Sequence, residues 1–122
     1  MNKLFISCPM KGRTEEQIRD SRNKMHKIAE AVFGEELEVI DSYIKNDPPA
    51  TNSIAIWMLG ESIKKMASAD YYIGTDIYDV RAKMHNYPGC IIENRVADSY
   101  KIERHYLKPS LVAPDILEDE DE

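Results

Sequence analysis

Glu93 lies in the stretch YPGCIIENRVADSY (87–100) and is the residue best placed to do chemistry. The apolar residues Ile92, Val96 and Ala97 predict a helix that begins after Gly89, with Glu93 in its first turn. Unpaired backbone N–H groups and the helix dipole favour a negative charge there, and an ionised carboxylate could attack an electrophilic carbon. Acids are also common in first turns because they complement the dipole, so the position alone leaves both interpretations open.

A second candidate is the loop SCPMKGRT (7–14), which connects an apolar run to the start of a predicted helix. Backbone N–H groups at such a junction bind anions. Ser7, Lys11, Gly12 and Arg13 could therefore hold a phosphate or a sugar. The spacing fits neither the P-loop nor the GxGxxG pattern, and an ordinary connection between a strand and a helix explains it equally well.

Cys8 invites a comparison with cysteine phosphatases, but only four residues separate it from Arg13 where those enzymes have five. A small buried thiol is the better interpretation. The chain has two cysteines and no CxxC pair, so we expect free thiols. The three histidines are far apart in sequence: His26, His85 and His105. We expect no metal site and no cofactor.

Aromatic side chains could stack on a planar base. Tyr71 and Tyr72 belong to an apolar run and are expected in the core. Tyr43 and Trp57 flank the turn-rich segment 45–53 and are the two aromatic residues that we expect in a ligand-binding wall.

Strand and helix patterns alternate along the chain. Strands are predicted at 3–7, 38–42, 71–75 and 102–107, and helices from Thr14 to the capping Gly34, over 55–67, and after Gly89. This order predicts an α/β fold: a single-domain flavodoxin- or Rossmann-like three-layer sandwich with a four- to five-stranded, mostly parallel sheet. In such sheets, ligands bind at the carboxyl ends of the strands, where the strand order reverses.

A chain of 122 residues suits one domain, which we expect over 1–108, followed by a C-terminal extension (109–122) with an acidic, disordered tail. Six acids lie at this end: Asp115, Glu118, Asp119, Glu120, Asp121 and Glu122. Without them, 16 of the 22 acidic side chains remain and balance the 16 basic ones. A neutral body argues against nucleic-acid binding.

No run of 18 apolar residues is present, so we expect no membrane span. We expect a soluble, cytoplasmic protein.

The order of these motifs resembles the nucleoside 2-deoxyribosyltransferase superfamily, in particular its small, often phage-encoded members. The resemblance covers about residues 3–107. It rests on FISCPMKGRTEEQI (5–18), EVIDSY (38–43), WMLGESIKKMASADYYI (57–73) and GCIIENRVADSY (89–100).

The resemblance implies that Glu93 is the catalytic nucleophile and that Asp70 is a second catalytic acid. It also implies that the strand-one loop lines the sugar site through Ser7, Met10 and Gly12. Independently of the resemblance, Gly89 would let a ligand approach the backbone closely. Where the family has an aspartate that helps to protonate the leaving base, this chain has Tyr87. Asp76 or Asp79 could substitute for it. A threonine of the family pattern is replaced by Cys90.

Together these features predict cleavage of an N-glycosidic bond, or (deoxy)ribosyl transfer, on a nucleoside or nucleoside 5′-monophosphate. The loop 7–12 would bind the 5′ end. An alternative is a catalytically inactive module that binds or senses a nucleotide, and a third possibility is an interaction protein that works through its acidic tail. The resemblance also implies a homo-oligomer.

Overall fold

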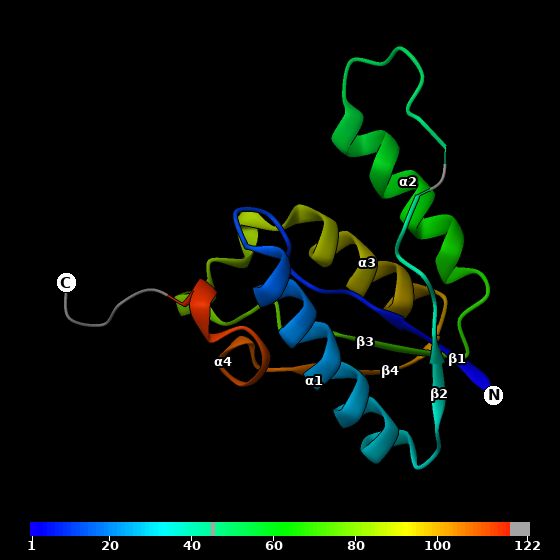
Figure 1. Cartoon of the computed structure of the whole chain (residues 1–122), viewed down its shortest axis with the longest axis vertical. Helices are drawn as coiled ribbons and strands as arrows, with labels where there is room; N and C mark the ends of the chain where they lie inside the picture. The colour runs from blue at the N-terminus through cyan, green and yellow to red at the C-terminus, as the bar shows by residue number, and fades with distance from the viewer. Residues whose placement is uncertain (45, 118–122) are drawn as a thin grey trace.

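The computed structural model describes residues 1–44 and 46–117. Its sheet has four strands, all parallel, in the order β2-β1-β3-β4 (Figure 1). The strands are β1 (Asn2–Ile6), β2 (Leu37–Val39), β3 (Tyr71–Thr75) and β4 (Glu103–Leu107), and the helices are α1 (Glu15–Phe33), α2 (Ile54–Met66), α3 (Pro88–Ser99) and α4 (Pro109–Val112). The predicted α/β sandwich is confirmed.

Helices cover both faces of the sheet. Successive residues of β1 point to opposite faces, as the pleat of a strand requires. Leu4 and Ile6 pack with Met25 of α1 and Val112 of α4 in one core cluster. Phe5 joins the other cluster, which is built from Met66, Tyr72 and Ala97 and lies beneath α2 and α3. The result is three layers, with α1 and α4 on one side and α2 and α3 on the other (Figure 1).

The ends of α1 are those that the sequence predicts. Thr14 and Gln17 form a capping box, in which each side chain accepts from the backbone N–H of the other residue. At the other end, Gly34 adopts φ 76°, and its N–H donates to the Glu30 carbonyl. Both ends are thus fixed by local chemistry.

The described part of the predicted C-terminal extension, residues 109–117, packs against the rest of the chain. Val112 is buried in the core cluster under α1, and Ala113 is also fully buried. The carboxylate of Asp115 forms an ion pair with Arg13, with an Nε–Oδ2 distance of 2.8 Å. Residues 109–117 therefore pack as part of the sandwich, and the predicted acidic tail from Glu118 onward lies outside the described residues.

Strand order determines where a ligand site can form. The chain leaves β1 toward the β2 edge of the sheet and leaves β3 toward β4, although β1 and β3 are neighbours. The two connections therefore diverge at the carboxyl ends of β1 and β3, the arrangement that opens a crevice in such sheets. Within residues 1–44 and 46–117, no helix is long and apolar enough to cross a membrane.

Candidate functional site

A cavity of about 500 Å³ lies at this crevice. Its walls come from the carboxyl end of β1, the residues after β2, α2 and the first two turns of α3. Most of the lining is apolar, with Phe5, Ile40, Leu59 and Ile92 among the wall residues. An apolar cavity with a few convergent polar groups is the usual form of a small-molecule site.

Glu93 lies at this cavity, and its side chain is held by two serines. The Ser7 hydroxyl, just after β1, donates to Oε1 at 2.7 Å, and the Ser62 hydroxyl on α2 donates to Oε2 at 2.6 Å. Glu93 is only 8% exposed but lines the cavity. Three separate elements therefore fix one carboxylate at the edge of an open space.

The position of Glu93 within α3 differs from the prediction. The helix begins at Pro88, whose fixed φ suits the first helical position, so Glu93 lies in the second turn. No acid occupies the first turn. The electrostatic effect of a helix end fades within one turn, so the serine hydroxyls replace it as the main support of the carboxylate.

The pKa of Glu93 is raised above its ordinary value, and burial is the main cause. The hydrogen bonds from Ser62 and Ser7 oppose this effect, as does the positive charge of Arg22, because each favours the ionised form. Opposing influences of this kind are typical of carboxyl groups in active sites. The arrangement suits a nucleophile or an acid–base group.

Among the described residues, three cationic side chains line the cavity: Lys11, Arg22 and Lys65. Lys65 is engaged by backbone carbonyls, since its Nζ donates to the carbonyl of Asp41 at 2.6 Å and also to that of Tyr43. Lys11 is exposed, and Arg22 is half-buried on α1. Within the described lining, Glu93 is the only acidic residue, so the cavity carries an excess of positive charge.

Several predicted residues are brought together here. Met10, Lys11 and Gly89 line the cavity with Glu93. Ser7 is 1% exposed and acts on Glu93 from inside the protein. A Cβ at position 89 would lie 3.8 Å from Cδ1 of Leu59, which is ordinary van der Waals contact. Gly89 therefore marks the place where α3 approaches α2 at the cavity.

Arg13 does not line the cavity, contrary to its predicted role in ligand binding. Its guanidinium donates to Asp115, to the Pro9 carbonyl at 2.8 Å and to the Ser21 hydroxyl at 2.7 Å. Its side chain is 2% exposed, so it ties the loop to the C-terminal segment. Gly12 also lies outside the lining, and its φ of 74° instead serves the turn of the loop.

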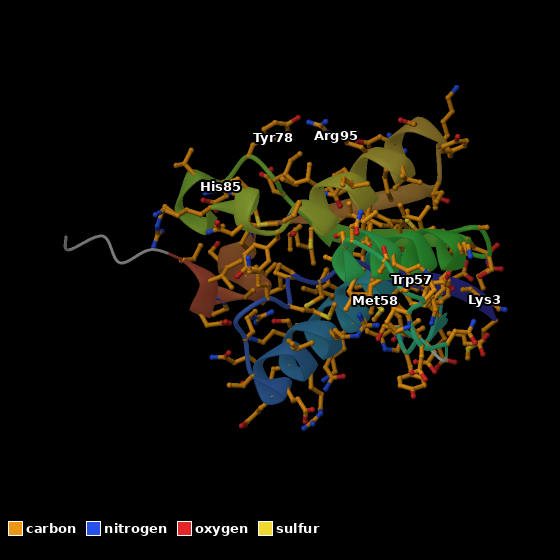
Figure 2. The ribbon with its side chains drawn as sticks, turned by 90° about the horizontal axis from the view of Figure 1, so that it is seen from above. Lys3, Trp57, Met58, Tyr78, His85 and Arg95 are labelled. Atoms are coloured by element: carbon orange, nitrogen blue, oxygen red, sulfur yellow. The ribbon has the colours of Figure 1, made fainter. Side chains whose placement is uncertain are left out.

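Asp70 lies at the amino end of the sheet, whereas Glu93 lies at its carboxyl end. It comes just before β3, where its carboxylate accepts the backbone N–H of Lys3 at 2.8 Å. Lys3 and His85 mark opposite ends of the molecule in Figure 2, and His85 belongs to the segment that leads into α3. The structure therefore does not bring Asp70 to the Glu93 cavity, because the amino and carboxyl ends of parallel strands lie at opposite ends of the sheet.

Asp76 follows β3 as predicted but lines a second cavity, of about 420 Å³, on the other flank of α3. Its carboxylate accepts the N–H of Tyr78 at 2.9 Å. Asp79 caps a short helical turn by accepting the N–H of Arg81. Neither acid belongs to the lining of the Glu93 cavity.

The two aromatic candidates are adjacent to the cavity but outside its lining. Ser42 and Ile44 line it on either side of Tyr43, which is 67% exposed. On α2 the two neighbours of Trp57, Ile56 and Met58, line the cavity, whereas Trp57 does not. Figure 2 labels Trp57 and Met58. Residues next to each other on a helix or an extended segment point in different directions. The prediction therefore named the correct segments but not the residues whose side chains face the cavity.

Ser62 and Arg22 are functional candidates that the sequence did not single out. Each is a polar residue on the apolar face of its helix: Ser62 lies among Leu59, Ile63 and Met66, and Arg22 follows Ile18 by four residues. A polar side chain on such a face is the signal that could have identified both.

Cys8 and Cys90 also line the cavity. Burial raises the pKa of both thiols, that of Cys90 to about 12, so they are protonated near neutral pH. This opposes thiolate attack and agrees with a packing role. In the described part of the chain, no three potential metal ligands gather in one place.

Comparison of the chain with protein-family models, with curated proteins and with solved structures gave no match.

Proposed function

We propose that this protein cleaves or transfers the N-glycosidic bond of a nucleoside or nucleoside 5′-monophosphate, with Glu93 as the nucleophile. The observation that carries the proposal is the position of Glu93, a buried carboxylate oriented by Ser7 and Ser62 beside a cavity of about 500 Å³. The motif order that resembles nucleoside 2-deoxyribosyltransferases supports the same assignment.

The proposed reaction has two displacements at C1′ of the sugar. A Glu93 oxygen forms a bond to C1′ while the C1′–N bond breaks, and its electron pair leaves with the base, which takes up one proton. Water or a second base then forms a bond to C1′ while the bond from C1′ to the Glu93 oxygen breaks, which releases the carboxylate. The attacking group gives up one proton, which restores the group that protonated the leaving base. Two inversions give net retention of configuration.

The proton for the leaving base must come from a group other than a carboxylic acid of the described lining, because Glu93 is the only one there. Tyr87 lines the cavity, and burial raises the pKa of its phenol, which keeps the hydroxyl protonated. We assign the proton to this hydroxyl in the proposed reaction.

The test is intact-mass measurement after incubation with 2′-deoxynucleosides and their 5′-monophosphates. We expect a sugar adduct on the parent protein and none on Glu93→Gln. Chromatography of the same mixtures measures free base. Base release by Glu93→Gln at the parent rate would contradict the assignment.

A second candidate is a nucleotide-binding module without catalytic activity. It is favoured by the absence of a second carboxylic acid from the described lining, since Asp70 and Asp76 lie elsewhere. Calorimetric titration with the same compounds separates the two proposals. Binding without any base release supports the module.

The homo-oligomer implied by the resemblance is part of this proposal. Ile56 is 72% exposed and Ile92 39% exposed, although both line the cavity. A second subunit would cover these side chains. Light scattering coupled to size-exclusion chromatography tests this, and a monomer at high concentration would contradict it. The predicted cytoplasmic location suits free nucleotides as substrates and stays a prediction.

A further inference from the structure

Arg22 is a half-buried cation that lines the cavity and has little to compensate its charge. It follows the buried Ser21 on α1, on the side that faces the sheet. Among residues 1–44 and 46–117 its guanidinium makes one hydrogen bond, a long one of 3.4 Å from Nη1 to the Ile6 carbonyl, and no ion pair. Removing a charge from water costs free energy unless a partner compensates it.

Arg22 lies close enough to the reactive end of the cavity for its charge to act there. It lowers the pKa of Glu93 and that of Cys8, against the larger effect of burial. Its guanidinium has five N–H donors in a planar fork, and the bond to Ile6 uses one of them. The remaining donors can bind an oxyanion in a bidentate manner.

The other cations are less suited to this role. Lys65 is held by the carbonyls of Asp41 and Tyr43, and Lys11 is exposed to water. Arg13, which the loop sequence suggests for anion binding, is neutralised by Asp115. Arg22 is thus the half-buried cation of the described lining that forms no ion pair and is not held by two carbonyls.

We infer that Arg22 recognises the phosphate monoester of a nucleoside 5′-monophosphate, on the α1 side of the cavity, while the sugar lies against Glu93. This inference rests on the proposed function for the class of ligand. It adds the residue that would make the enzyme prefer phosphorylated over unphosphorylated nucleosides. A charge-assisted bidentate contact gives a preference of roughly 10- to 100-fold.

The test is calorimetry in the Glu93→Gln background, where turnover does not disturb the binding measurement. The probes are the four 2′-deoxynucleosides and their 5′-monophosphates. We expect the monophosphate to bind roughly 10- to 100-fold more tightly than the matching nucleoside. Adding Arg22→Gln should reduce this preference to about twofold or less, and Arg22→Lys, which keeps the charge but loses the fork, should leave an intermediate preference.

Arg19→Gln is the matched control, since Arg19 lies on the same helix but is exposed and outside the lining. We expect it to retain the full preference. Circular dichroism checks that each variant is folded, and if Arg22→Gln is not folded, Arg22→Lys decides the outcome. The inference is overturned if the preference survives the Arg22 substitutions, or if the Glu93→Gln protein shows no preference for monophosphates.

Base release by the parent protein separates this inference from the proposed function. An Arg22-dependent preference for monophosphates without any base release would contradict the glycosidic reaction and support the role of Arg22. Equal kcat/KM for nucleosides and monophosphates would support the reaction and overturn the role of Arg22.

Discussion

Glu93 and Asn94 are consecutive residues of α3 that face different cavities and use their polar atoms differently. Both ends of the Asn94 amide bind β3: Oδ1 accepts from the Tyr72 hydroxyl, and Nδ2 donates to the Thr75 carbonyl at 2.8 Å. Glu93 also has a partner for each oxygen, yet it lines an apolar cavity whose described lining includes the cationic side chains of Lys11, Arg22 and Lys65. A carboxylate oxygen accepts more than one hydrogen bond, so Glu93 keeps capacity for a ligand.

The comparison teaches how to separate a structural polar residue from a functional one. Asn94 joins α3 to β3, and its backbone carbonyl accepts from Tyr106 of β4 at 3.1 Å. Removing the Asn94 side chain should lower stability. Burial raises the pKa of Glu93. Removing its charge should lower activity rather than stability.

The largest expected effect is on activity. Glu93→Gln keeps the size of the side chain but removes the nucleophilic carboxylate. Its amide oxygen accepts from one serine hydroxyl, and its NH2 donates to the other. We expect base release to fall by about 10³-fold or more, with little change in the midpoint of thermal unfolding. Chromatographic assay and calorimetry measure the two quantities. If the variant were unfolded but kept the parent activity per folded molecule, Glu93 would have the structural role that we assign to Asn94.

Asn94→Ala should act mainly on stability. It leaves the Tyr72 hydroxyl and the Thr75 carbonyl without their partner in a buried region. We expect the free energy of unfolding to fall by about 2–4 kcal/mol, since each unpaired buried group costs about 1–3 kcal/mol. Urea denaturation measures the change. Asn23→Ala, at an exposed position of α1, is the control and should stay within about 0.5 kcal/mol of the parent.

Gly74→Ala tests the structural role of Asn94 from β3, the strand that carries Gly74. A Cβ at this position of β3 would lie 2.5 Å from Asn94 Oδ1 and 2.9 Å from a ring carbon of Tyr72. We expect a loss of about 1–3 kcal/mol in the free energy of unfolding, because both neighbours are held by their hydrogen bond.

Gly60→Ala is the matched control for Gly74→Ala. A Cβ on Gly60, inside α2, meets nothing within 4 Å. The substitution should raise the free energy of unfolding by about 0.5–1 kcal/mol, since alanine is the better helix former. Equal effects of the two substitutions would show that close packing at Gly74 does not matter.

Ser62→Ala tests the support of the carboxylate. The Ser62 hydroxyl favours the ionised form of Glu93, so its loss should raise the pKa of Glu93 further. We expect the acid limb of the kcat/KM profile to move to higher pH, and activity on that limb to fall about tenfold at a fixed pH. Ser68→Ala, exposed at the end of α2, should leave the profile unchanged. A shift to lower pH would contradict this sign.

The smallest expected effect is the pH dependence of stability. Because burial raises the pKa of Glu93, the folded protein binds this proton more tightly than the unfolded chain, whose carboxyl titrates near 4.5. This tighter binding of the proton stabilises the folded protein fully below the unfolded pKa. The stabilisation is lost as the pH rises through the folded pKa. The free energy of unfolding of Glu93→Gln relative to the parent should therefore increase as the pH rises from the unfolded value near 4.5 through the folded pKa. Urea denaturation across this range would contradict the expectation if the difference fell.

The local features of the chain were predictable because short-range chemistry determines them. Thr14, Gln17 and Gly34 carry the caps of α1 in their own residue types. The apolar run at 71–75 gives β3 at the predicted residues, and the alternation of elements gives the parallel sheet. The rule that ligands bind at the carboxyl ends of strands brought Glu93, Met10 and Lys11 to the same cavity.

The assignment of partners was decided only by the tertiary structure. Arg13 and Arg22 are both cations near the predicted loop, but Asp115 reaches Arg13 from 102 residues away in sequence and leaves Arg22 at the cavity. Asp70 and Asp76 flank β3. Asp70 lies at the amino end of the strand, away from the Glu93 cavity, and Asp76 lines the second cavity on the other flank of α3. The amino-acid order determines which residue types are available and which elements carry them. Which side chains meet depends on long-range packing, because contacts between distant segments leave no periodic signal in the chain.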